Sequence, residues 1–133
     1  MKIIAYTEGF IETQILMDYR SGVLDAVNFI VNMRQLGPLK FSELSAMHLI
    51  ADCPDAVERA ALVWFFYGVP VYAVSAAISK RARAILQALP PPSALSPADA
   101  IIAATALIHK LPLYALDPGR FGIVPGLNCI PPY

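Results

Sequence analysis

The chain has 133 residues, a length typical of one domain, and 57% of them are hydrophobic, which is enough for a full core. Ten basic and ten acidic side chains give a formal net charge of zero, which argues against non-specific nucleic-acid binding by charge alone. The two cysteines, Cys53 and Cys129, match no metal or redox spacing, so we expect a reduced, cytoplasmic setting. No apolar run reaches the length of a membrane span and no signal-peptide pattern opens the chain, so we expect one domain over 1–133 and no membrane partner.

The first half of the chain predicts helices alternating with short apolar strands. Glycine and proline punctuate the pattern, at Gly9, Gly22 and Gly37-Pro38. We expect, in chain order, a β-rich segment over 3–11, a short helix over 15–19, an amphipathic helix over 24–35, a strand over 39–41, and helices over 44–51 and 54–67.

The second half continues with a strand over 69–73 and a helix over 75–89. The next helix is expected to start after Ser96, a good N-cap followed by Pro97 at the first helical position. Residues 98–111 are almost all apolar, which indicates a buried helix, and Pro112 ends it. A short buried strand over 113–116, a turn at 117–119 and a final strand complete an α/β sandwich with a mostly parallel sheet.

Two aspartates fall where open α/β folds usually place their sites. Asp99 lies in the first turn of the buried helix. Asp117 lies just past the end of the strand expected over 113–116. Each also has an ordinary reading, because acids are favoured in first helical turns and Asp-Pro-Gly is a common turn.

The last third of the chain carries a specific pattern. It contains ADAIIAATA at 98–106, a turn at 115–117 ending in Asp117, the aromatic Phe121, and PGL at 125–127. This stretch resembles the end of a PIN domain, and most of all the VapC toxins of bacterial toxin–antitoxin pairs. The resemblance implies a PIN-like three-layer α/β/α sandwich with a short, mostly parallel sheet.

Two earlier motifs of that family fit more loosely. Residues 12–22 resemble the first motif, with Glu12 in the place of an aspartate ligand, and residues 42–49 resemble the second, with His48 in the place of a glutamate. Their separation of 36 residues is normal for the family. A competing register places Tyr6 at the first position, but it supplies no ligand and lengthens the separation to 42 residues, so we prefer Glu12.

The resemblance implies a catalytic site made of Glu12, His48, Asp99 and Asp117. The three carboxylates would hold Mg²⁺ or Mn²⁺, which prefer hard oxygen ligands and activate water for attack on a phosphodiester. His48 is open to three readings: a ligand acceptable to Mn²⁺, a proton carrier near neutral pH, or a core or helix-face histidine.

The resemblance therefore implies a metal-dependent endoribonuclease acting on structured RNA, held by a small antitoxin protein and forming a homodimer through apolar helices. Two alternatives stay open. One is a PIN-fold interaction protein without nuclease activity. The other is an unrelated small α/β domain, which would not bring Asp99 and Asp117 within reach of one metal ion.

Overall fold

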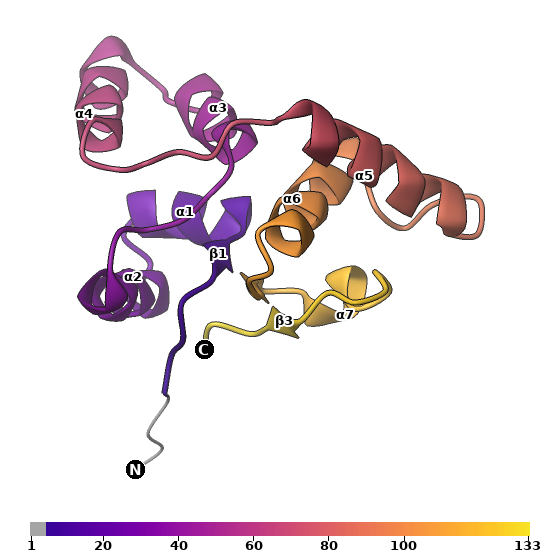
Figure 1. The fold of residues 1–133 in the computed structure, drawn as a ribbon. Coiled ribbons are helices and arrows are strands. Elements are labelled where there is room, and N and C mark those ends of the chain that lie inside the picture. Colours follow the sequence, from indigo (N-terminus) through magenta and orange to yellow (C-terminus); the bar gives the residue numbers. More distant parts are fainter. Residues whose placement is uncertain (1–4) are drawn as a thin grey trace.

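The computed structural model describes residues 5–133 (Figure 1), so residues 3 and 4 of the expected first strand lie outside it. Its elements are, in chain order, β1 (Phe10–Ile11), α1 (Thr13–Arg20), α2 (Leu24–Leu36), α3 (Glu43–Ala51), α4 (Ala56–Phe66), α5 (Ala76–Ala88), α6 (Pro97–Ile108), β2 (Leu113–Tyr114), α7 (Pro118–Phe121) and β3 (Cys129–Ile130). None of the helices in this part of the chain is long and apolar enough to cross a membrane.

The three strands form one parallel sheet in the order β1–β2–β3. Phe10 lies opposite Leu113, which in turn lies opposite Cys129. The sheet therefore joins the start of the chain to its end, and β2 is the central strand of the three.

Two extended segments continue the sheet beyond β1 without becoming strands. Single parallel bridges join Phe10 to Lys40 and Ser42 to Tyr72. The strands expected over 39–41 and 69–73 are thus reduced to one bridge each, because only one or two residues of each segment reach a neighbouring backbone.

Side chains alternate across this sheet and divide the core into two. Phe10 and Leu113 face α5 and α6, in a core dominated by the small residues of α6. Ile11 and Tyr114 face the opposite side, against α1, α2, α3 and α4. Figure 1 shows the two groups of helices on either side of the strands, which confirms the three-layer α/β/α sandwich.

Three boundaries differ from expectation. No strand precedes Phe10 within residues 5–9, where Gly9 passes so close to β2 that an added Cβ would lie 2.9 Å from Tyr114 Cε2. Helix α6 ends at Ile108, three residues early, because the chain turns out of the helix at Lys110, whose φ is 57°. The turn expected at 117–119 instead begins the short helix α7.

Candidate functional site

Glu12 occupies the junction between β1 and α1, at the carboxyl-end edge of the sheet. Its residue is 5% exposed, and the Oε2 atom is buried without a hydrogen-bond partner. Burial raises the pKa of the Glu12 carboxyl above its usual value, Asp99 adds to the rise, and Arg120 opposes it. A buried carboxylate with one oxygen that lacks a hydrogen-bond partner can bind a cation or a proton.

Asp99 lies at the same edge, in the first turn of α6. It forms a reciprocal capping box with Ser96, whose Oγ accepts from the Asp99 N–H at 3.1 Å while Asp99 Oδ2 accepts from the Ser96 N–H at 3.4 Å. Asp99 is 8% exposed. The capping box fixes the carboxylate against the helix N-terminus, where negative charge is favoured.

Arg120, in α7, lies between these carboxylates. Its Nη1 donates to Asp99 Oδ2 at 3.0 Å, and its Nη2 is 3.8 Å from Glu12 Oε1. Its Nε is 4.0 Å from Asp117 Oδ2. We call Glu12, Asp99 and Asp117 the acidic cluster; one guanidinium contacts all three of its members.

Asp117 differs from the other two because its side chain is largely exposed. It caps α7, with Oδ1 accepting from the Arg120 N–H at 3.1 Å. The sequence predicts Asp117 as a turn residue at this edge of the sheet. In the structure, its Oδ1 binds the Arg120 backbone N–H and its Oδ2 lies near the Arg120 side chain. Arg120 is not among the site residues that the sequence motifs indicate. Its spacing of three residues from Asp117 is the sequence feature that corresponds to this contact.

His48 is exposed on α3. Among residues 5–133, no hydrogen bond or ion pair joins its side chain to the acidic cluster. Ser45, also on α3, is buried, and its Oγ lies 2.8 Å from Thr13 Oγ1 in the first turn of α1. This bond links α3 to α1 directly beside Glu12.

The donor set fits a divalent cation in chemistry but not in its present arrangement. Within the described residues, no group of three or more His, Cys, Asp or Glu side chains is disposed to hold a metal ion. Glu12 and Asp99 nevertheless offer buried carboxylate oxygens, one of them unpartnered. Mg²⁺ is often held by one or two carboxylates plus waters and phosphates, so this pair would suffice if the Arg120 guanidinium moved out.

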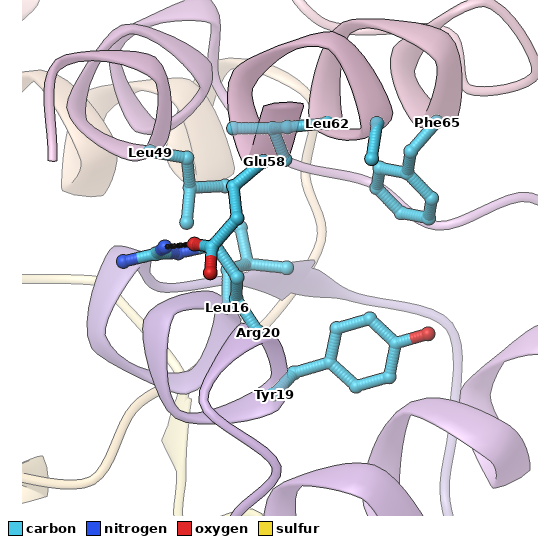
Figure 2. A pocket seen from close by; sticks show the side chains of 8 residues that line it. Leu16, Tyr19, Arg20, Leu49, Glu58, Leu62 and Phe65 are labelled. Atoms are coloured by element: carbon cyan, nitrogen blue, oxygen red, sulfur yellow. Dashed lines mark hydrogen bonds and ion pairs between the residues drawn. The ribbon is translucent and has the colours of Figure 1, made fainter. Parts of the chain in front are cut away.

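A separate apolar pocket of about 300 Å³ opens on the other side of α1, between α1, α3 and α4. Figure 2 shows Tyr19 and Phe65 at one end of it and the Arg20–Glu58 contact at the other. Arg20 pairs with Glu58 at 3.3 Å and with Asp52 at 2.7 Å. The pocket is therefore an apolar groove with a charged rim.

Comparisons with known proteins agree with this architecture. A family model described as PIN domain matches residues 38–124, whereas no curated protein matches the sequence. Among solved structures, a chain of a toxin–antitoxin complex from Klebsiella pneumoniae is 24% identical, with a TM-score of 0.76 over 95% of this chain and 98% of that one.

Two further solved structures share the fold at lower identity. VapBC2 from Rickettsia felis, bound to a DNA fragment from its promoter, gives 14% identity and a TM-score of 0.73, covering 92% of this chain and 96% of that one. FitAcB from Neisseria gonorrhoeae gives 17% identity and a TM-score of 0.68, covering 94% and 98%.

Proposed function

This chain belongs to the PIN domain family, and from that membership we propose that it is a metal-dependent endoribonuclease of the VapC toxin type, acting on structured RNA. The observation that carries the proposal is the pair of buried carboxylates, Glu12 and Asp99, at the carboxyl-end edge of a parallel sheet. Glu12 keeps one oxygen without a partner.

The residues of the chain divide the work in this proposal. Glu12 and Asp99 hold Mg²⁺ or Mn²⁺, which when bound supplies Lewis-acid chemistry at the phosphodiester. Asp117, exposed at the rim, completes the cluster and accepts hydrogen bonds from the water or substrate that enters. The Thr13–Ser45 bond holds the start of α1, and therefore Glu12, in place.

A small antitoxin is the proposed protein partner, seated in the apolar pocket between α1, α3 and α4. The proposal is supported by the lining of that pocket and by two neighbouring aromatic side chains, Trp64 and Tyr67, which are 77% and 82% exposed. Arg20 and Glu58 at the rim offer charges of both signs to a bound helix. A homodimer would cover other apolar side chains, such as Leu24 on α2.

The deciding experiment is a calorimetric titration of metal-free protein with Mn²⁺ and Mg²⁺, followed by an RNA-cleavage assay. Asp99→Asn should lose metal binding and cleavage. Asp25→Asn is the matched control, because Asp25 occupies the first turn of α2 but lies exposed and away from the cluster. Absence of both metal binding and cleavage in the native protein at millimolar metal would refute the proposal.

The second candidate is a PIN-fold interaction protein without nuclease activity. It is favoured by the exposed position of His48 and by the guanidinium of Arg120 among the carboxylates. The two candidates differ in the effect of restoring the family's residues. If Glu12→Asp combined with His48→Glu produces cleavage that the native protein lacks, this second function is supported.

A further inference from the structure

The positive charge within the acidic cluster comes from the chain itself. Arg120 lies 3.0 Å from Asp99, 3.8 Å from Glu12 and 4.0 Å from Asp117, measured between charged atoms. A divalent cation bound by these carboxylates would require the same oxygens, above all Asp99 Oδ2. Guanidinium and metal therefore compete for one place.

The backbone of Arg120 is held firmly on both sides. On one side, its N–H donates to the capping carboxylate of Asp117 at 3.1 Å. On the other, Phe121 is fully buried and anchors the end of α7. The Arg120 guanidinium itself lies over the Phe121 ring, with its Cζ atom 4.8 Å from the ring centroid. The side chain is 34% exposed overall, although its Nε atom is buried without a hydrogen-bond partner, so only part of the guanidinium faces solvent while α7 stays docked.

A guanidinium keeps its charge across the physiological pH range, so Arg120 itself is not discharged by a change of pH. A better anion can draw it away from the carboxylates. Phosphate binds guanidinium through two parallel hydrogen bonds, and an RNA backbone presents many phosphates to a partly exposed arginine.

We propose that Arg120 is an internal counter-cation that closes the acidic cluster to metal, and that an RNA phosphate opens it by drawing the guanidinium away. The inference rests on the proposed function for the identity of the anion. It makes metal loading dependent on substrate: without RNA the Arg120 guanidinium occupies the cluster, and with RNA bound the carboxylates become free for the ion.

The occupied site has a quantitative consequence. A protein whose binding-competent form is a minor fraction shows a dissociation constant raised by the inverse of that fraction. Removing the guanidinium should therefore tighten Mn²⁺ binding, and we expect about a tenfold or larger decrease in Kd for Arg120→Gln.

The test is calorimetric titration of Mn²⁺ into the full-length native protein, Arg120→Gln and the control Arg81→Gln, which removes the same charge from an exposed position on α5. The proposal expects tighter binding in Arg120→Gln alone. Adding Asp99→Asn to Arg120→Gln should abolish the gain. Equal affinity in all three proteins, or weaker binding in Arg120→Gln, would overturn it.

Thermal unfolding keeps the test decisive if removal of Arg120 weakens the fold. Without metal, Arg120→Gln should melt below the native protein, because two buried carboxylates lose their counter-charge. Mn²⁺ should then raise its melting temperature more than that of the native protein. Arg120→Lys, which retains the charge but not the planar fork, should bind Mn²⁺ with an affinity between the two; a Kd no tighter than native in both variants would count against the proposal.

The role of RNA is measured separately, with a short phosphorothioate RNA as probe. It should tighten Mn²⁺ binding by the native protein and leave the affinity of Arg120→Gln unchanged. An equal effect on both would refute the coupling. If Arg120→Gln gains Mn²⁺ affinity but no variant cleaves RNA, the ribonuclease function fails and the closure by Arg120 stands. If the native protein cleaves RNA while Mn²⁺ affinity is the same in the native protein and the Arg120 variants, the ribonuclease function stands and the closure by Arg120 fails.

Discussion

Replacing Glu12 with glutamine should stabilise the metal-free protein at neutral pH. The Glu12 residue is 5% exposed, its Oε2 has no partner, and its Oε1 lies 3.8 Å from Arg120. An unsatisfied buried polar group costs about 1–3 kcal/mol, and more when it is charged, while attraction to Arg120 returns part of that cost. Since burial is the largest influence on the Glu12 pKa and raises it, charging this carboxyl costs more in the folded protein than in the unfolded chain. We expect Glu12→Gln to gain about 1 kcal/mol, the lower end of that penalty.

The pH dependence follows from the sign of this shift. A carboxyl whose pKa is raised in the folded state binds its proton more tightly there than in the unfolded chain. Its contribution is therefore fully present below the unfolded pKa and is lost as pH rises through the folded one. The native protein and Glu12→Gln should have similar stability near pH 4 and diverge above it, with the variant the more stable.

Urea denaturation followed by circular dichroism, at several pH values and in the presence of a chelator, measures the difference. Glu43→Gln is the control, because Glu43 is half-exposed in the first turn of α3, where charge is favoured. That variant should lose a few tenths of a kcal/mol instead of gaining, by loss of the dipole interaction. A Glu12→Gln protein less stable than native at pH 7.5, with no divergence above pH 4, would refute the reasoning.

Three other experiments test the packing that builds the site. Gly9→Ala should destabilise the fold by about 1–3 kcal/mol in urea denaturation, because its Cβ would meet the β2 tyrosine ring at 2.9 Å, whereas Gly68→Ala, with only one atom near at 3.9 Å, should change little. Thr13→Val and Ser45→Ala should couple by about 0.5–1.5 kcal/mol in a double-mutant cycle, because their hydroxyls bond at 2.8 Å; additive effects would contradict this. Phe121→Leu should lower stability by about 1–3 kcal/mol and, by loosening α7, tighten Mn²⁺ binding; unchanged Mn²⁺ affinity in a destabilised variant would separate the two effects.

The sequence predicts α6 well because its determinants are local. A serine cap, a proline at the first position and an uninterrupted apolar run all favour a buried helix, and the structure confirms it to within three residues. The short sheet is less predictable. Residues 39–41 and 69–73 have strand composition, but the number of residues that pair is fixed by how far neighbouring backbones run side by side, which depends on the whole fold.

The candidate site follows the same division. Asp99 is predicted at the sheet edge from its helix, and Glu12 from the motif that surrounds it. Arg120 contacts Asp99, 21 positions away in the sequence, and Glu12, 108 positions away. These contacts depend on the docking of α7, so no local sequence pattern predicts them.

The pairing of β1 with β2 has a consequence for the timing of synthesis. Phe10 cannot meet Leu113 until most of the chain has left the ribosome, and Arg120 follows later still. At typical elongation rates of about 5–20 residues per second, the nascent chain passes several seconds with its first helices made and its sheet unformed. The acidic cluster is thus assembled only after Arg120 has been synthesised. A growing chain exposes Glu12 without its partners, so whatever the proposed site acts on cannot be engaged by the full cluster until Asp99 and Arg120 have been made and docked.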